Sequence, residues 1–126
     1  MRFLVDTNVY IRALAGKEPD ASFLKKAVRN ETVVLSPIVI AEFLTRSLKK
    51  EQKIFEEIEH TFLTLPVDGE TARIAAVYRK QFLQTSRTKL LDCFLAAQAK
   101  QNNATLVTNN LRDFQMNDIK IVAPRV

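Results

Sequence analysis

The hydrophobic positions along this chain fall into short continuous runs, separated by longer stretches in which apolar residues recur at helical spacing. Short runs of this kind are typical of buried strands, and apolar residues three and four positions apart are typical of helices that pack on a core. Strands are therefore predicted at 2–5, 32–36, 104–110 and 118–124, with 65–67 as a candidate for a short edge strand. Helices are predicted at 7–14, 20–30, 36–50, 51–65, 68–83 and 88–102.

The alternation of strands with helices indicates the fold class. Strands that are separated by helices usually pair in parallel, and a parallel sheet is covered by helices on both faces. The chain has only two glycines, Gly16 and Gly69, which argues against an all-β fold with many tight turns. The pattern therefore predicts an α/β protein with a short, mainly parallel sheet.

Polar residues at three of the predicted helix starts are expected to act as N-caps. Ser36 is followed by Pro37, which suits the first helical position, so this start is strongly marked. Asp20 and Thr88 are the expected caps of the helices in 20–30 and 88–102.

Size and composition restrict the classes of protein further. A chain of 126 residues suits one domain, spanning 1–126. Its single cysteine, Cys93, fits a reducing compartment, and it has neither a signal-peptide pattern nor an apolar segment of the length that a membrane span needs. A cytoplasmic protein with no membrane partner is therefore expected. The net charge of +5 and the pI of about 9.6 point to an anionic partner, with nucleic acid first, although a merely solvated surface would have the same composition.

Four acidic residues stand at positions where a carboxylate needs an explanation. Asp6 directly follows the first strand, and Asp113 follows the third. Glu42 and Asp92 are single acids inside apolar helical blocks, "IAEFL" and "KLLDCFL". Each alone could be a cap, a loop residue or a solvent-facing acid. Because sites in open α/β sheets form beyond the carboxyl ends of the strands, the four are expected to meet at one edge.

Carboxylates that gather in this way repel one another, and a divalent cation would resolve the repulsion. Ligand sets made only of oxygen favour Mg²⁺ or Mn²⁺. With His60 and Cys93 as the only residues of their kinds, no His/Cys zinc site can be assembled within one chain. A carboxylate site for Mg²⁺ on a basic protein indicates phosphodiester chemistry, because a cation can activate water and stabilise the leaving oxygen.

The motifs around these acids match a known family. The chain carries "LVDTNVYI" near its start, "SPIVIAEFL" in the middle and "KLLDCFLAAQAKQNNATLVTNNLRDF" near its end. In these motifs and in its length it resembles the PIN-domain ribonucleases, and most of all the small VapC-type toxins of toxin–antitoxin pairs. The resemblance implies a PIN-like three-layer α/β/α sandwich. It also implies that Asp6, Glu42 and Asp92 are the three main acids of the metal site.

The fourth acid is less clearly marked than the others. The family pattern after the third strand matches Thr108, Asn110, Asp113 and Phe114 here. Asp113 is the preferred fourth catalytic and metal-binding acid, and Asn110 is its competitor. By the same resemblance, positioning roles are expected for four residues, namely Thr7, Asn8, Thr108 and Asn110.

Three basic residues are candidates for contact with RNA phosphates. Arg87 and Lys89 flank the start of the helix that carries Asp92, and Arg112 precedes Asp113. All three could equally be solvated surface charges.

The expected function is that of a metal-dependent endoribonuclease. By resemblance it would be the toxin of a type II toxin–antitoxin system, form a homodimer and be silenced by a cognate antitoxin. Apolar residues in 23–28 and 70–83 also favour a homodimer, because they exceed what a small sheet can cover. Two alternatives remain open from the residues: a catalytically inert PIN-like module that binds RNA, and a receiver-like signalling domain with an acidic cluster.

Overall fold

A computed structural model of the protein describes residues 1–84 and 88–125. Its centre is a four-stranded sheet with the spatial order β2-β1-β3-β4, in which every neighbouring pair is parallel. The strands are short, as predicted: β1 (Phe3–Val5), β2 (Val33–Val34), β3 (Thr105–Val107) and β4 (Ile121–Val122).

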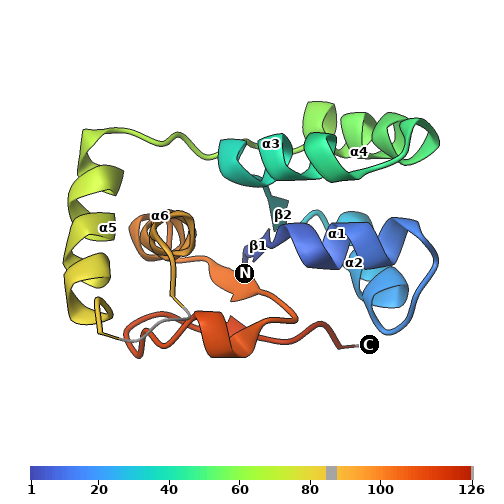
Figure 1. Ribbon diagram of the computed structural model, residues 1–126. Helices are drawn as coiled ribbons and strands as arrows, with labels where there is room; N and C mark the ends of the chain where they lie inside the picture. Colours follow the sequence, from blue (N-terminus) through green and yellow to red (C-terminus); the bar gives the residue numbers. More distant parts are fainter. Residues whose placement is uncertain (85–87, 126) are drawn as a thin grey trace.

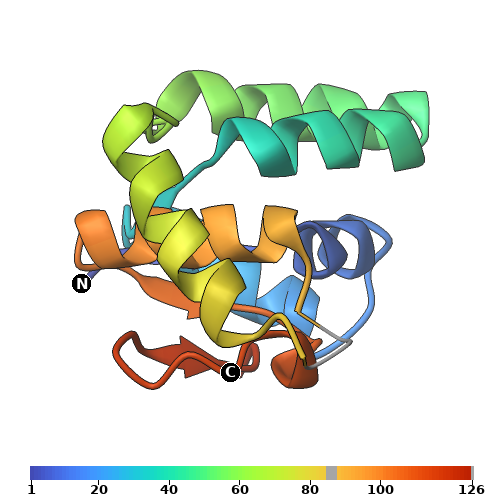
Figure 2. The same cartoon turned by 60° about the vertical axis from the view of Figure 1, so that its left-hand side comes forward.

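Helices cover both sides of this sheet. Figure 1 shows α1 and α2 on one side of β1, with α6 and then α5 on the other, while α3 and α4 run side by side. Figure 2 shows α5 packed across α6. The predicted α/β sandwich is thus confirmed. The helices are α1 (Thr7–Leu14), α2 (Asp20–Arg29), α3 (Pro37–Arg46), α4 (Lys49–Thr61), α5 (Gly69–Gln81) and α6 (Leu90–Gln101), with a short 3₁₀ helix η1 at Leu111–Asp113.

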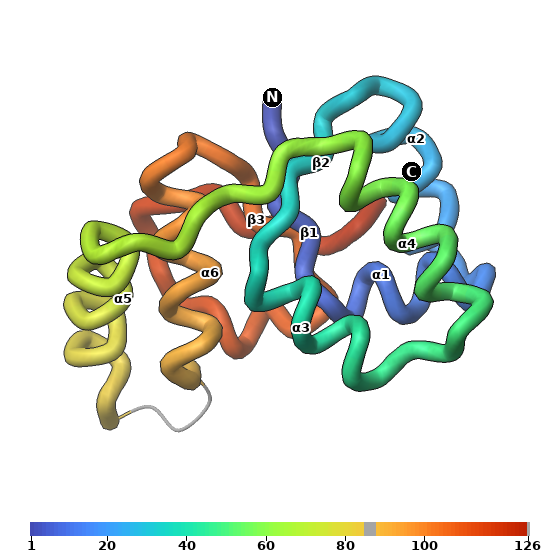
Figure 3. The backbone as a smooth tube through the Cα atoms, turned by 90° about the horizontal axis from the view of Figure 1, so that it is seen from above, coloured from blue at the N-terminus to red at the C-terminus, as the bar shows by residue number. Residues whose placement is uncertain are grey.

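The strand order fixes where a site can form. The chain leaves β1 toward β2 on one side, whereas it leaves β3 toward β4 on the other. The connections therefore diverge between β1 and β3, and in open α/β sheets such a switch point, at the carboxyl ends of the strands, is where the crevice that binds ligands forms. Val5 pairs with Val107, so the residues that follow each strand, Asp6 and Thr108, are neighbours across the sheet. Figure 3 shows the end of β1 and the start of α6 at the same end of the molecule.

An apolar core holds this edge in place. Leu4, Val5 and Val107 are fully buried, as expected for strands covered on both faces. Between α1, α3 and α4, the ring of Phe43 stacks on Phe55 at 4.3 Å, and Tyr10 meets Phe55 edge-on at 5.0 Å. These ring contacts fix α1 and α3 against α4, and therefore also the residues that α1 and α3 present to the crevice.

Two of the three predicted N-caps were wrong. Ser36 caps α3 as expected, because its Oγ accepts a hydrogen bond from Ile38 N at 3.1 Å. Asp20, however, is the first residue of α2, and its carboxylate is engaged elsewhere. Thr88 lies one residue before the N-cap position of α6, which Lys89 occupies.

Several predicted element boundaries also differ from the structure, among them the ends of the strands predicted at 104–110 and 118–124, which are observed at Thr105–Val107 and Ile121–Val122. The helix predicted at 36–50 ends at Arg46, since Ser47 and Leu48 are extended, and α4 then begins at Lys49. Residues 65–67 form no strand; the only pairing in this part of the described chain is a single parallel bridge between Leu35 and Thr64.

The apolar helix faces are used unequally. Phe23, Leu24 and Ala27 of α2 are buried in the core, so Val28 is the only apolar residue of the segment 23–28 that stays partly exposed. Val77 and Leu83, by contrast, are 57 % and 60 % exposed. Only the second of the two segments behind the homodimer expectation therefore keeps largely exposed apolar side chains. Among the described residues, no helix is long and apolar enough to cross a membrane.

Candidate active site

Asp6 is the central acid of the crevice. It ends β1, adopts an extended conformation and is the N-cap of α1, so its side chain is held at the start of that helix. Its Oδ1 accepts a hydrogen bond from Thr7 N at 2.8 Å. Its Oδ2 accepts hydrogen bonds from Thr108 Oγ1 at 2.9 Å and from Asn8 Nδ2 at 3.2 Å. Although only 8 % of Asp6 is exposed, both of its oxygens are hydrogen-bonded.

The Thr108 hydroxyl is fully used in this arrangement. It donates to Asp6 and accepts from Asn8 Nδ2 at 3.3 Å and from Asn110 N at 3.0 Å. A hydroxyl has one proton and two lone pairs, so the two N–H donors leave its proton directed at Asp6. Contacts of this kind are what the predicted positioning roles of Asn8, Thr108 and Asn110 require, and for Asn110 the contact comes from its backbone.

Thr7 links Asp6 to the second acid, Glu42. The backbone N–H of Thr7 donates to Asp6, and its hydroxyl donates to Glu42 Oε1 at 2.8 Å. Thr7 is buried, and Glu42 reaches it from the half-buried face of α3. The packing of α1 against α3 thus brings an acid that is 36 residues away in the sequence to the side of Asp6.

Asp92 approaches from the opposite helix layer. It lies in the first turn of α6, where its Oδ2 accepts a hydrogen bond from Lys89 N at 3.0 Å. The pKa of Asp92 is raised to about 6, chiefly by burial and also by the negative charges of Asp113, Asp6 and Glu42, while the hydrogen bond from Lys89 N opposes the shift. Burial also raises the pKa of Asp6; the Thr108 hydrogen bond opposes this shift and the charge of Glu42 adds to it. The four predicted acids therefore lie close enough to act on one another electrostatically.

Asp113 lies in the turn that follows β3. After β3 the chain coils into η1, where Asp113 N donates to the carbonyl oxygen of Asn110 at 3.0 Å. The next residue, Phe114, is buried in the core and anchors the turn. The charge of Asp113 acts on Asp92, as the raised pKa of Asp92 shows.

The donor set fits a hard divalent cation in its chemistry. All four acids offer carboxylate oxygen, which Mg²⁺ and Mn²⁺ prefer. Acids whose charges raise one another's pKa are also the groups that a cation would stabilise. In residues 1–84 and 88–125, however, no three Asp, Glu, His or Cys side chains are gathered closely enough to hold a metal ion as they stand. The four acids thus act on one another electrostatically, but as they stand they do not form a metal cage.

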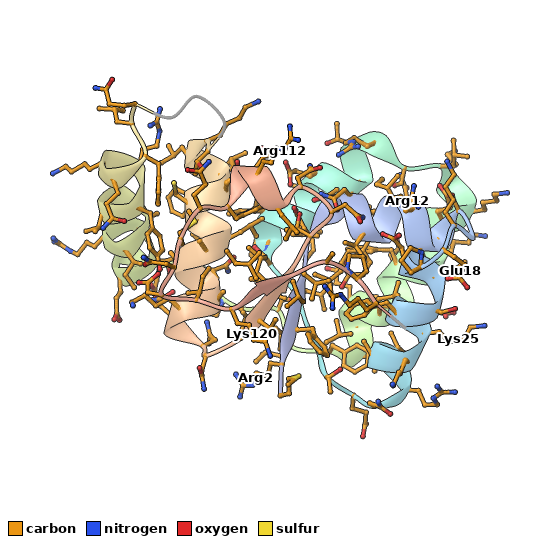
Figure 4. All side chains as sticks on the ribbon, turned by 90° about the horizontal axis from the view of Figure 1, so that it is seen from below. Arg2, Arg12, Glu18, Lys25, Arg112 and Lys120 are labelled. Carbon is orange, nitrogen blue, oxygen red and sulfur yellow. The ribbon has the colours of Figure 1, made fainter. Side chains whose placement is uncertain are left out.

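The structure describes two of the three candidate phosphate-binding residues. Lys89 is exposed at the start of α6, and Arg112 is exposed in η1. Figure 4 shows Arg112 at one end of the sheet, with Arg2 and Lys120 at the other. Arg87 lies outside the described residues, so its predicted role stays a prediction.

Two residues of this edge were missed by the sequence analysis. Asp20 is fully buried, and its Oδ1 accepts a hydrogen bond from Arg12 Nε at 3.0 Å. Its Oδ2 accepts one from Asn109 Nδ2 at 2.7 Å, and Asn109 in turn contacts Asn8. An aspartate that follows a proline reads as a helix cap, and nothing in the local pattern could indicate a partner 89 positions away.

Comparison with known proteins agrees with this geometry. Residues 3–120 match the PIN domain family. The chain is 30 % identical over 124 residues to ribonuclease VapC2 of Rickettsia felis, and the match covers 91 % of each chain. Among solved structures, VapBC2 of Rickettsia felis bound to a DNA fragment from its promoter superposes with a TM-score of 0.78 at 22 % identity, over 98 % of each chain. FitAcB of Neisseria gonorrhoeae gives 0.73 at 25 % identity, over 97 % of each chain.

The parallel α/β sandwich, with acids near the point between β1 and β3 where the connections diverge, is the arrangement expected from the family resemblance of the sequence. The chain belongs to the PIN-domain family and, within it, to the VapC-type ribonucleases. The predicted fold and protein class are therefore confirmed, and the receiver-like alternative is excluded.

Proposed function

We propose that this protein is a Mg²⁺- or Mn²⁺-dependent endoribonuclease whose cation site is supplied by Asp6, Glu42, Asp92 and Asp113. The observation that carries the proposal is that Thr7 links two acids at the carboxyl end of β1: its backbone N–H donates to Asp6 and its hydroxyl donates to Glu42. In addition, burial and the charges of the other three acids raise the pKa of Asp92 to about 6. Perturbation of this kind, at the crevice of an α/β sheet, is characteristic of groups kept for function.

Different residues of the chain would have different roles in phosphodiester hydrolysis. When bound, a divalent cation would polarise the phosphodiester and lower the pKa of the attacking water. Thr108 and Asn8 hold the Asp6 carboxylate through hydrogen bonds to its Oδ2, and Thr7 fixes Glu42 beside it. Lys89 and Arg112 are exposed near Asp92 and Asp113 in the sequence, and they would offset the charge of an RNA phosphate.

The partners follow from the same proposal. RNA is the substrate, a cognate antitoxin silences the nuclease, and the whole chain, residues 1–126, forms one domain that pairs as a homodimer. The exposed Val77 and Leu83 of the α5 region support an apolar contact between two copies. Sedimentation at micromolar concentration should give a species of twice 14.4 kDa. A monomer alone would contradict the homodimer and leave the nuclease proposal intact.

The nuclease proposal is tested with labelled structured RNA, incubated with Mg²⁺, with Mn²⁺ and with EDTA. Cleavage is expected with either cation and not with EDTA. Cleavage that persists in EDTA would overturn the metal dependence. Retention of RNA without cleavage under every condition would instead support the inert RNA-binding alternative.

A further inference from the structure

A chain of hydrogen bonds joins the buried Asp20 to the acid at the centre of the site. Asp20 Oδ2 accepts from Asn109 Nδ2 at 2.7 Å. Asn8 Oδ1 accepts both from Asn109 Nδ2 at 3.3 Å and from Asn109 N at 3.1 Å. Asn8 Nδ2 then donates to Asp6 Oδ2 at 3.2 Å. The chain thus runs from the start of α2, through the loop after β3, to the end of β1.

The donor and the acceptor of each hydrogen bond in this chain can be assigned, because the chain contains groups that can only donate or can only accept. The backbone N–H of Asn109 can only donate, so the atom of Asn8 that faces it must be the amide oxygen. The amide nitrogen of Asn8 is therefore turned to Asp6 and Thr108. At the other end, the Asp20 carboxylate is paired with Arg12 and can only accept, which turns the nitrogen of the Asn109 amide toward it.

The burial of Asp20 is not explained by a capping role. The N–H of Ser22, in the first turn of α2, already donates to Glu18 Oε1 at 2.8 Å. Figure 4 shows Arg12 and Glu18 together at the turn between α1 and α2, where Arg12 also donates to the Glu18 carbonyl oxygen at 3.0 Å. Asp20 is nevertheless fully removed from solvent, whereas the Arg12 side chain is 41 % exposed. A carboxylate buried to this extent is costly unless its hydrogen bonds are specific.

An aspartate suits this position because each of its two oxygens has a separate donor. Oδ1 receives the Arg12 Nε–H and Oδ2 receives the Asn109 Nδ2–H. An asparagine has the same size but only one oxygen, so its NH2 group would face the N–H donor of either Arg12 or Asn109. Rotating the amide by half a turn would only move this donor–donor contact from one partner to the other. Asp20→Asn therefore breaks the chain without opening a cavity.

We propose that Asp20 is a positioning residue of the ribonuclease site: it holds the Asn109 amide, which fixes Asn8, and Asn8 holds the Asp6 carboxylate. The inference rests on the proposed function, because it concerns how the acids are held for a cation and for RNA. Asp20 itself touches neither; its effect reaches Asp6 through two side-chain amides. Residues that orient a metal ligand from behind typically change metal affinity or activity by about 10–100-fold when replaced.

The first experiment compares Asp20→Asn with Asp118→Asn in the full chain. Asp118 makes the same kinds of contact, one salt bridge and one further hydrogen bond, at the other end of the sheet. Mn²⁺ affinity is measured by calorimetry, and kcat and KM are measured with a labelled RNA. Asp20→Asn should weaken Mn²⁺ binding and lower kcat about 10-fold or more, with little change in the KM for RNA. Asp118→Asn should leave all three unchanged, although both variants lose stability.

The second experiment asks whether Asp20 acts through Asn109. Asn109→Ala removes only an exposed side chain, so the variant should fold, and its loss of Mn²⁺ affinity should be at least as large as that of Asp20→Asn. In the double variant the two losses should not add, because both break the same chain. Additive losses, or wild-type Mn²⁺ affinity and kcat in Asn109→Ala, would overturn the proposal even if Asp20→Asn failed to fold.

Asp92→Asn separates this inference from the function on which it rests. If Asp92→Asn keeps wild-type Mn²⁺ binding and cleavage, the proposed function itself is wrong. If Asp92→Asn loses both while Asp20→Asn keeps both, only the role assigned to Asp20 is wrong.

Discussion

Acids at the two ends of the sheet lie in opposite electrostatic surroundings. At the carboxyl end, burial and then the charges of the neighbouring acids raise the pKa of Asp92 to about 6. Near the amino end, Asp118 accepts hydrogen bonds from Lys100 Nζ and from the Tyr78 hydroxyl, each at 2.8 Å. Lys100 above all, with help from Tyr78, holds the pKa of Asp118 below its ordinary value.

The contrast separates acids that contribute to folding from acids that the fold tolerates. A carboxylate that has a cation and a hydroxyl as partners is stabilised in its charged form. Acids that act on one another through like charges destabilise the fold in the absence of a cation. Proteins keep such local conflicts chiefly where function requires them. The comparison can therefore be tested by making the same substitution at each end.

The largest expected effect is on catalysis at the carboxyl end. Asp92→Asn should lower the rate of RNA cleavage at least about 100-fold, because it removes a proposed direct ligand of the cation. At neutral pH and in EDTA its thermal midpoint should equal or exceed that of the wild type, since a repelled charge has been removed. The pair of measurements is the cleavage rate with Mg²⁺ and the melting curve without it.

Asp118→Asn is the same substitution at the amino end of the sheet, and the opposite effects are expected. It should keep the wild-type cleavage rate and lose stability, because it breaks a salt bridge rather than relieving repulsion. A fall in the melting temperature of Asp92→Asn would mean that Asp92 is a structural cap and that the comparison is wrong. Asp6→Asn is a less clear probe, since the Asp6 carboxylate accepts three hydrogen bonds that an amide cannot all keep.

The next effect in size distinguishes the two candidates for the fourth ligand. Asp113→Ala should weaken Mn²⁺ binding and slow cleavage, but less than Asp92→Ala does. Asn110→Ala should have the smallest effect, because the contacts that the structure gives Asn110 come from its backbone N–H and carbonyl, which alanine retains. Calorimetric titration of Mn²⁺ into the three variants gives the ranking. If Asn110→Ala proved the most damaging, Asn110 rather than Asp113 would hold the fourth position.

The same contrast explains which features the sequence could predict. The strands were predictable because each is a continuous apolar run, and Val5 and Val107 are indeed buried on both faces. The four candidate acids could be singled out because each interrupts or follows such a run, and because the family motifs contain them. Local chemistry was enough for Ser36, whose cap serves the helix that it begins.

Features that depend on distant partners were not predictable. Asp20 looked like a cap, yet its carboxylate is bound by Arg12 and by Asn109, which lies 89 residues away. Val77 is an apolar residue of the helix predicted at 68–83, yet it is 57 % exposed because Ala75 and Tyr78 form the inner face of α5. Helical spacing defines an apolar stripe, and the neighbouring elements decide how much of it is covered.

A smaller effect is expected in the pH dependence of stability without a cation. Between the ordinary pKa of 3.8 and the folded value of about 6, the folded protein binds more protons at Asp92 than the unfolded chain does. The contribution of Asp92 to the free energy of unfolding therefore falls as the pH rises through that window. Urea midpoints in EDTA should show the advantage of Asp92→Asn over the wild type growing from pH 4 to pH 7. A pH-independent difference would contradict the assignment.

The smallest expected effect is at the amino end, where Tyr78→Phe removes one hydroxyl and keeps the ring. Tyr78 donates to Asp118, whose lowered pKa makes a stability contribution that is present above pH 3.8 and lost as the pH falls below it. Tyr78→Phe should therefore cost about 1 kcal/mol of unfolding free energy at pH 7 and less at pH 3, where Asp118 becomes protonated. Cleavage should be unchanged, because the pair lies at the end of the sheet away from the four acids. Urea unfolding at the two pH values checks the first expectation, and a loss of cleavage would mean that the two ends of the sheet are coupled.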